Sequence, residues 1–160
     1  MLPLPPEGSF THLFLSGGSE ELESIIRDLG LAEQVSRSLP QPGSADAAVL
    51  LDGSHPPLRQ VAQCLKAEGL LYWQFSRRGL VHFRRTTTRI LEQVRAAGLS
   101  PIGLYWVRPE SGLPRVFVPL DVSGAISWYL DTFSGRRGEL AFRFPRLSRV
   151  LAAATARRIG

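Results

Sequence analysis

The sequence predicts one α/β domain built on a mostly parallel sheet that ends in an antiparallel hairpin. Short apolar runs alternate with segments whose apolar residues recur at helical spacing, which is typical of strands that alternate with helices. Residues 47–51 form an uninterrupted apolar run, as expected of a parallel strand covered on both faces. Only the turn Pro109-Glu110-Ser111-Gly112 separates the last two predicted strands, and so short a connection favours an antiparallel pair.

The first strand and helix are predicted within residues 10–30. Residues 10–15 form a short buried strand, and Ser16-Gly17-Gly18-Ser19 is the turn that follows it. Ser19 is a favourable N-cap, and glutamates in the next turn complement the helix dipole. Gly30 ends the helix. Its predicted buried face repeats at i, i+3, i+4 and i+7 and consists of Leu22, Ile25, Ile26 and Leu29.

The middle of the chain is predicted to contain strands over residues 32–36, 47–51 and 70–75. A helix begins near Pro57, since proline fits the first turn of a helix, and Gly69 stops it. Its predicted buried face is Leu58, Val61, Ala62 and Leu65.

The second half begins with a predicted basic loop over residues 76–85 and a helix over 86–97, with Ile90, Leu91 and Val94 inward. The hairpin strands follow at 101–107 and 115–120, and a weaker helical pattern covers 122–133. Residues 146–158 place four apolar residues on one helical stripe, which predicts a helix that docks on this domain or on a partner; an anionic membrane surface is the alternative. That stripe is Leu147, Val150, Leu151 and Ala154.

These elements divide the chain into a Pro-rich lead-in (1–9), the α/β domain (10–133) and an Arg-rich C-terminal segment (134–160). The single cysteine, Cys64, excludes an internal disulfide framework, and no metal-ligand spacing exists, so we expect no metal. No apolar stretch reaches the roughly 20 residues needed to cross a bilayer, and the first residues do not read as a signal peptide. We therefore expect a cytoplasmic protein.

Residues 39–75 resemble the middle of the class I S-adenosylmethionine-dependent methyltransferases, of the methyltransferase type 11-like group. The approach through Pro42-Gly43-Ser44 and Asp46 into residues 47–51 is similar to the approach to that family's fourth strand. Residues 65–69, Leu-Lys-Ala-Glu-Gly, are similar to its Leu-Lys-Pro-Gly-Gly turn, with two of the five positions different. The sequence Ala-Gly-Leu at 97–99 is similar to its lead into strand six. The resemblance covers residues 10–120 and implies a Rossmann-like methyltransferase fold.

The departures from the family pattern concern the cofactor. The family's first strand ends in an acidic residue and a Gly-x-Gly-x-Gly loop, which lets the backbone approach the cofactor. About 30 residues separate Leu15 from Ala47, too few for three strands, so we place residues 10–15 on the family's second strand, with its first strand and glycine loop missing. The alternative is that Ser16, Gly17 and Gly18 are a shortened cofactor loop at a helix N-terminus.

Candidate catalytic residues lie after the strand at 47–51. Ligands of open α/β sheets bind at the carboxyl ends of the strands, where Asp52, Ser54 and His55 are expected. The resemblance implies a substrate or base position here, and His55 has the chemistry to accept a proton near neutral pH. The competing interpretation is a loop whose aspartate caps the next helix.

A basic patch forms a separate candidate for binding an anion or a partner. Residues 69–91 carry five arginines and no acidic residue, and aromatic side chains lie between them. We favour a protein partner over nucleic acid; a small-molecule substrate and a homo-oligomer stay open. The patch is Arg77, Arg78, Arg84, Arg85 and Arg89.

Two functions are therefore expected from the sequence. The first is a degenerate methyltransferase-like domain without bound S-adenosylmethionine that acts as a binding or assembly module; iron–sulfur assembly proteins of the anamorsin type carry a similar cofactor-less domain, although this chain lacks their cysteine-rich tail. The second is an active S-adenosylmethionine-dependent methyltransferase of a small molecule, whose cofactor half comes from a partner or is missing from this chain. Whether the protein is an enzyme is left open at this point.

Overall fold

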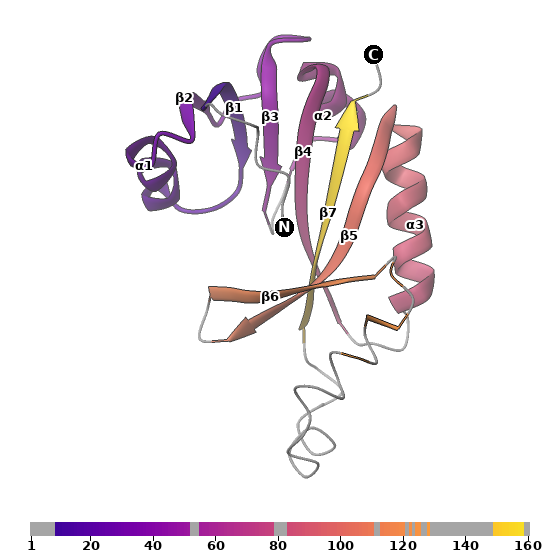
Figure 1. The fold of residues 1–160 in the computed structure, drawn as a ribbon. Helices are drawn as coiled ribbons and strands as arrows, with labels where there is room; N and C mark the ends of the chain where they lie inside the picture. Colours follow the sequence, from indigo (N-terminus) through magenta and orange to yellow (C-terminus); the bar gives the residue numbers. More distant parts are fainter. Residues whose placement is uncertain are drawn as a thin grey trace.

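The computed structural model contains one sheet of seven strands in the order β2-β1-β3-β4-β7-β5-β6 (Figure 1). It describes residues 9–51, 55–78, 83–110, 113–120 and 149–158, together with 122, 124, 125 and 128. Within these residues the strands are β1 (Phe10–Ser16), β2 (Ala32–Ser36), β3 (Ala45–Leu50), β4 (Leu65–Arg78), β5 (Leu99–Glu110), β6 (Leu113–Pro119) and β7 (Arg149–Arg158). The helices are α1 (Glu20–Asp28), α2 (Leu58–Cys64) and α3 (Phe83–Ala96).

The parallel half of the sheet consists of β2, β1, β3 and β4. β1 pairs in parallel with β2 and β3, and β3 pairs in parallel with β4. Two pairings fix the register around β1, because Leu13 lies opposite Val35 of β2 and Ala47 of β3. From β1 the chain moves to β2 on one side of β1. It then crosses back over β1 to β3 and continues in that same direction to β4.

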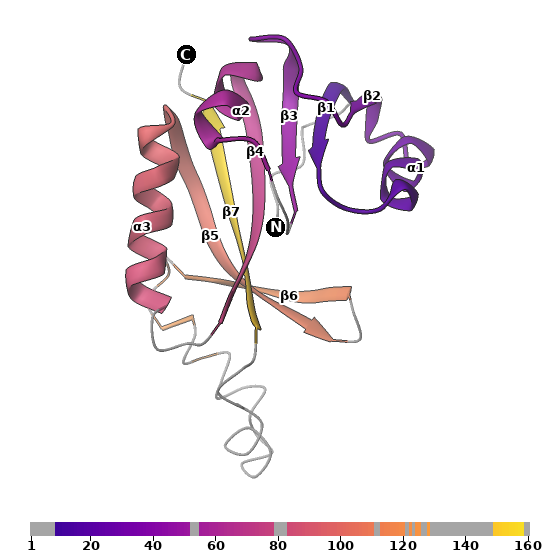
Figure 2. The same ribbon diagram turned by 180° about the vertical axis from the view of Figure 1, so that it is seen from behind.

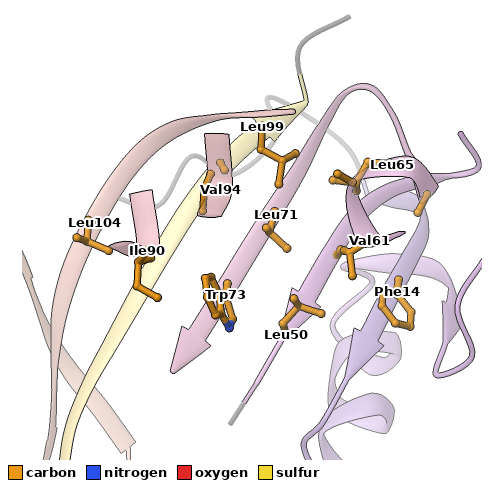
Figure 3. Close-up of a cluster of buried hydrophobic side chains, with 14 residues drawn as sticks. Phe14, Leu50, Val61, Leu65, Leu71, Trp73, Ile90, Val94, Leu99 and Leu104 are labelled. Atoms are coloured by element: carbon orange, nitrogen blue, oxygen red, sulfur yellow. The ribbon is translucent and has the colours of Figure 1, made fainter. Parts of the chain in front are cut away.

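Helices cover both faces of this half. Alternate residues of a strand face opposite sides of a sheet, and the alternation in β1 divides the core in two. Phe14 belongs to the larger cluster with residues of α2 and α3, whereas Leu13 and Leu15 belong to a smaller cluster with Ile26 of α1. Figure 2 shows α2 and α3 in front of the sheet, and Figure 3 shows Val61, Ile90 and Val94 packing on Leu50, Leu71 and Trp73.

The antiparallel half contains the expected hairpin and a strand that the sequence does not predict. β5 and β6 pair antiparallel, with Val107 opposite Phe117, as the short turn indicates. Between β4 and β5 lies β7, which pairs antiparallel with both. The helix predicted over residues 146–158 is therefore wrong for residues 149–158. They form a central strand that is paired with a neighbour on each side.

Arginines at the end of β7 attach this strand to the elements beside it. Arg158 donates hydrogen bonds to the carbonyl oxygens of Gln63, at 3.3 Å, and Leu65, at the C-terminal end of α2. Arg157 forms an ion pair of 3.1 Å with Glu68. Carbonyl groups at the end of a helix lack partners within the helix, so a guanidinium at this place is a favourable cap.

Two further predictions from the sequence differ from the structure. β4 extends to Arg78 and α3 begins at Phe83, so most of the predicted basic loop 76–85 is strand and helix. In α1 Ile26 is buried, but Ile25 and Leu29 are 44% and 66% exposed, because the helix contacts the sheet with a narrower face than its apolar pattern indicates. Most of the helix predicted at 122–133 lies outside the described residues. None of the described helices has the length and apolar character needed to span a membrane.

Candidate ligand site at the carboxyl ends of the parallel strands

The direction of the strand order reverses between β1 and β3. From β1 the chain proceeds to β2 on one side, and from β3 it proceeds to β4 on the other (Figure 1). In open α/β sheets, ligands bind outside the carboxyl ends of the strands at this switch point. The residues that follow β1 and β3 therefore form the first place to examine for a cofactor.

The turn after β1 packs directly against the residue that follows β3. The Leu51 N–H donates to the Ser16 carbonyl oxygen, at 2.9 Å. Gly17 and Gly18 both have positive φ, 86° and 76°. A Cβ on Gly17 would lie 3.2 Å from the Leu51 carbonyl oxygen, and one on Gly18 would lie 2.9 Å from Leu51 Cδ1. The two glycines thus allow the turn to approach Leu51, which occupies the space beside it.

Arg37, immediately after β2, binds the other side of the same turn. Its guanidinium donates to the carbonyl oxygens of Ser19, at 2.6 Å, and Gly18, at 3.3 Å. It also forms an ion pair of 2.8 Å with Glu23 of α1. The turn is therefore held between Leu51 and an arginine that uses its donors within the chain.

These residues do not fit S-adenosylmethionine as the family pattern would hold it. Recognition of a ribose in such folds uses an acidic side chain at a strand end near the glycine loop. Ser16 and Gly17 occupy the end of β1, and Ser36 and Arg37 occupy the end of β2. No carboxylate stands at either strand end, and the glycines contact Leu51, not open space.

The predicted catalytic pair is described only in part. Asp52 and Ser54 lie outside the described residues, whereas His55 is partly buried beside β4. The His55 Nδ1 lies 2.8 Å from the Pro56 carbonyl oxygen. Because a carbonyl oxygen only accepts, Nδ1 carries the proton in this contact, and in the neutral ring Nε2 is then the basic nitrogen.

An aromatic side chain of β4 packs against His55. Its ring meets Trp73 edge-on, with ring centroids 5.5 Å apart and an interplanar angle of 78°. Phe75, two residues further along β4, lies 5.0 Å from Trp73, centroid to centroid. The Trp73 side chain is 6% exposed, and its Nε1–H has no hydrogen-bond partner among the described residues. A buried donor without a partner costs about 1–3 kcal/mol, so a group or ordered water that accepts this hydrogen bond would be favoured.

The basic patch lies further along β4 and at the start of α3. Arg77 and Arg78 are the last residues of β4, and Arg84 and Arg85 belong to the first turn of α3. Arg89, in the next turn, is exposed. Arg149 of β7, which is not part of the patch predicted from the sequence, lies directly opposite Arg78 in the sheet.

Other polar residues of the described chain have structural partners. Asp46 accepts hydrogen bonds from Lys66 and from the His12 N–H, and His12 Nε2 lies 2.9 Å from Ser36 Oγ. The Cys64 thiol is buried and donates to the Pro40 carbonyl oxygen, and burial raises its pKa. Within the described ranges, no group of three His, Cys, Asp or Glu side chains could hold a metal ion.

Three residues of this edge are not predicted from the sequence. In the sequence, Leu51 is the last residue of a predicted strand, Arg37 follows a predicted strand but belongs to no motif, and Trp73 is predicted to be a core residue. Alternation in the run 70–75 places Trp73 and Phe75 on one face, but only the fold brings His55 to it. No sequence signal indicates that residue 149 pairs with residue 78.

Comparisons with known proteins agree with the fold. A phosphoethanolamine N-methyltransferase 2 from Haemonchus contortus, solved with S-adenosyl-L-methionine, has a TM-score of 0.60 and 10% identity; the match covers 98% of this chain and 50% of that one. A methyltransferase structure from Bacillus halodurans C-125 has a TM-score of 0.56 and 10% identity, over 98% and 95% of the two chains. The [4+2]-cyclase SpnF has a TM-score of 0.54 and 18% identity, over 96% and 76%.

No family model matches the sequence, and no curated protein matches it either. The structural neighbours and the mixed seven-stranded sheet together define the class: the chain has the class I methyltransferase fold, as the sequence resemblance implies. It spans half the length of the Haemonchus protein.

The strand order fits two relations to the doubly wound fold. That fold has the order 3-2-1-4-5 in its first five strands. Removal of its strand 1 leaves 3-2-4-5, and removal of its strand 3 leaves 2-1-4-5; both give the observed order β2-β1-β3-β4. In either relation the turn after β1 lies at the switch point, so in both cases Leu51 occupies the space beside this turn.

Proposed function

We propose that this chain is a methyltransferase-like domain that acts as a binding or assembly module and does not hold S-adenosylmethionine by itself. The observation that carries the proposal is the contact of Gly17 and Gly18 with Leu51 at the switch point. A cofactor in that position needs the space that Leu51 fills. The hydrogen bonds of Arg37 to the same turn add support. They place an arginine at a strand end where recognition of a ribose uses a carboxylate.

Exposed apolar side chains near α1 and β2 support a role in binding a protein. Four of them lie within residues 25–39, next to an edge strand of the sheet. Apolar groups gathered at one edge favour a protein interface over isolated exposure. They are Ile25, Leu29, Leu31 and Leu39, each at least 40% exposed. We expect such a protein to act in the cytoplasm, since its single cysteine offers no disulfide.

Titration of the purified chain with S-adenosylmethionine and S-adenosylhomocysteine tests the proposal. We expect no heat of binding in calorimetry and no rise in melting temperature at about 1 mM ligand, since a ligand that binds only the folded chain must raise that temperature. A dissociation constant of about 100 μM or tighter, roughly −5.5 kcal/mol, contradicts the proposal. In that case Gly17→Ala tests whether the ligand binds at the turn after β1, because a ligand bound there should bind the variant more weakly.

The second candidate function is an active small-molecule methyltransferase whose cofactor half is supplied by a partner. The proton position on His55 favours it, because Nδ1–H bonded to Pro56 leaves Nε2 as a base. In this proposal His55 accepts a proton from the substrate, and Asp52 positions the substrate or His55. His55→Gln keeps a polar group but removes the base; we expect it to abolish methyl transfer by the complete complex, whereas Gln63→Ala, an exposed change in α2, leaves the activity unchanged.

A further inference from the structure

We propose that the face of β3 and β4 beside α1 is a docking surface for an amphipathic helix of a partner protein, whose polar residues are basic. The inference rests on the proposed function as a binding module, and it names the chemistry of the partner. The surface consists of Val49, Leu70 and Tyr72 of the sheet together with Glu21, Ile25, Asp28 and Leu29 of α1.

The described helices cover the two faces of the sheet unequally. α2 and α3 lie on one face, and α1 lies on the other, beside β1 and β2 (Figures 1 and 2). Ala47 belongs to the cluster under α1, and its direct partner on β4 is Leu70. The next pair on this face is Val49 with Tyr72. Parallel strands of α/β proteins are covered by helices on both faces, so apolar residues here favour a further helix.

α1 turns an apolar side towards this part of the sheet. Ile25 and Leu29 are about one turn apart and are 44% and 66% exposed. Glu23, which lies nearly opposite Ile25 around the helix, forms an ion pair with Arg37, directly after the edge strand β2. The Glu23 side of α1 therefore faces the edge of the sheet, and the apolar side faces towards β3. A helix placed beside α1 would contact these apolar side chains and the sheet together.

Acidic side chains on α1 indicate the charge of the partner. Glu21 and Asp28 are exposed and lie on the same side of α1 as Ile25, at helical spacing. Neither carboxylate forms an ion pair with a described residue. Lysine or arginine on the incoming helix would pair with them. A second copy that used the same face would instead bring like charges together, which opposes association. The surface therefore favours a basic helix over a symmetric dimer.

The test uses two synthetic helical peptides. The basic probe consists of two Leu-Lys-Lys-Leu-Leu-Lys-Leu repeats, and the control has Glu at every Lys position, so both present the same apolar stripe. Binding to the full chain is followed by the fluorescence anisotropy of the labelled peptide at about 0.15 M salt. We expect a dissociation constant of about 100 μM or tighter for the basic probe and at least about tenfold weaker binding of the acidic one. No binding of the basic probe, or equal binding of both peptides, overturns the proposal.

A pair of apolar variants locates the bound probe. Ile25→Gln with Leu29→Gln should weaken its binding by about tenfold or more. Leu39→Gln with Ile102→Gln is the matched control, because these side chains are 40% and 41% exposed but lie outside the surface. We expect the control pair to change the dissociation constant by less than about twofold. Equal weakening by the two pairs would mean that the peptide binds elsewhere.

A pair of charge variants tests the sign of the partner. Glu21→Gln with Asp28→Asn should weaken the basic probe by about fivefold or more. Glu33→Gln with Glu92→Gln removes the same charge from exposed positions outside the surface and should weaken it by less than about twofold. Equal weakening would show general attraction and would overturn the proposal. All four double variants change exposed side chains, so each should melt within about 3 °C of the wild type.

Two further measurements identify other occupants and keep the two proposals distinct. In analytical ultracentrifugation of the chain alone, a dimer that Ile25→Gln with Leu29→Gln dissociates would overturn the proposal, because a second copy would then cover the face. Binding of S-adenosylmethionine in the separate titration would contradict the proposed function, whatever the peptides do. A chain that binds neither the cofactor nor the basic peptide would overturn the docking surface alone.

Discussion

The Lys66 ammonium lies 2.7 Å from Oδ1 of Asp46, while Oδ2 of the same carboxylate accepts a hydrogen bond of 2.8 Å from the backbone N–H of His12. One side chain of β3 thereby joins β1 and β4 at the amino ends of the parallel strands. The contact lies where the register of β3 against β4 shifts, between Ala45 and Ala47.

The Asp46 contacts predict a loss of stability in acid. Burial raises the pKa of this carboxyl, but the hydrogen bonds from Lys66 and His12 and the charge of Lys66 outweigh it and hold the pKa below its ordinary value. A carboxyl with a lowered pKa in the folded state stabilises above its unfolded pKa, about 3.9, and the stabilisation is lost as the pH falls through the folded value. We expect the difference in melting temperature between the wild type and Asp46→Asn to shrink below about pH 4.

Lys66→Met is the matched control for this prediction. It removes the ion pair but keeps the acceptor of the His12 N–H, and the lysine is 43% exposed. We expect Asp46→Ala to cost about 1–3 kcal/mol at pH 7, because it leaves a backbone donor without its acceptor. Lys66→Met should cost less than about 1 kcal/mol. Equal costs for the two variants in urea unfolding would show that the ion pair, and not the backbone contact, carries the effect.

The contact between Gly18 and Leu51 predicts that Gly18→Ala is more harmful than a change at another glycine of similar φ. Both Gly18 and Gly43 have positive φ, 76° and 70°, so alanine is strained at either. A Cβ at Gly43 has nothing within 4 Å, whereas one at Gly18 meets Leu51 Cδ1 at 2.9 Å and Leu22 Cδ2 at 3.0 Å. We expect Gly43→Ala to cost about 1 kcal/mol and Gly18→Ala about 1–3 kcal/mol more.

Addition of Leu51→Ala to the Gly18 variant tests the cause. Removal of the crowding atom should recover part of the cost of Gly18→Ala, so the two changes should be non-additive in chemical unfolding. Additive losses of unfolding free energy would mean that a side chain at position 18 does not clash with Leu51. The main support for the proposal that the chain does not hold S-adenosylmethionine would then be lost.

Local patterns of the sequence predict the parallel half of the fold well. β2 occupies the predicted residues 32–36, and the prediction for α2 identifies Val61 and Ala62 as buried. Leu65 is also buried, but it begins β4, because α2 ends at Cys64 and not near Gly69 as predicted. These elements carry strong local signals: apolar periodicity, a proline near the helix start and glycines at turns. The burial of Ile90 and Val94 in α3 follows from the same periodicity.

The predictions that depend on distant pairing are less successful. Residues 150–156 are rich in alanine, which fits a helix by propensity, but their place between β4 and β5 makes them a strand; tertiary pairing overrides the local preference. The same limit applies to the candidate site. His55 and the glycine turn stand out in the sequence, whereas Leu51, Arg37 and Trp73 act through neighbours that only the fold provides.

Glu68 predicts a stabilising substitution. It has a φ of 64°, the left-handed region that glycine adopts without steric cost, and it stands where the resembling methyltransferase turn has a glycine. Its ion pair with Arg157 joins two exposed side chains and contributes little. We expect Glu68→Gly to raise the stability by about 0.5–1 kcal/mol, a rise of about 1–4 °C in melting temperature. Glu68→Ala, which keeps the strain, should not raise it.

The adjacent arginines of β7 should differ in their effect on stability. Arg158 donates to the carbonyl oxygens of Gln63 and Leu65, which end α2 and have no partner within the helix, whereas Arg157 only pairs with the exposed Glu68. We expect Arg158→Met to cost about 1–3 kcal/mol, because methionine keeps the apolar stem but removes the donor to the partly buried Leu65 carbonyl oxygen, whereas the Gln63 carbonyl oxygen keeps its hydrogen bond from the Gly43 N–H. Arg157→Met should change the stability by less than about 0.5 kcal/mol. The two variants differ by one position in the same strand and lose the same charge, so urea unfolding at one pH compares them directly. If their unfolding free energies agree within error, β7 is held by its pairing with β4 and β5 alone, and the cap on α2 contributes nothing.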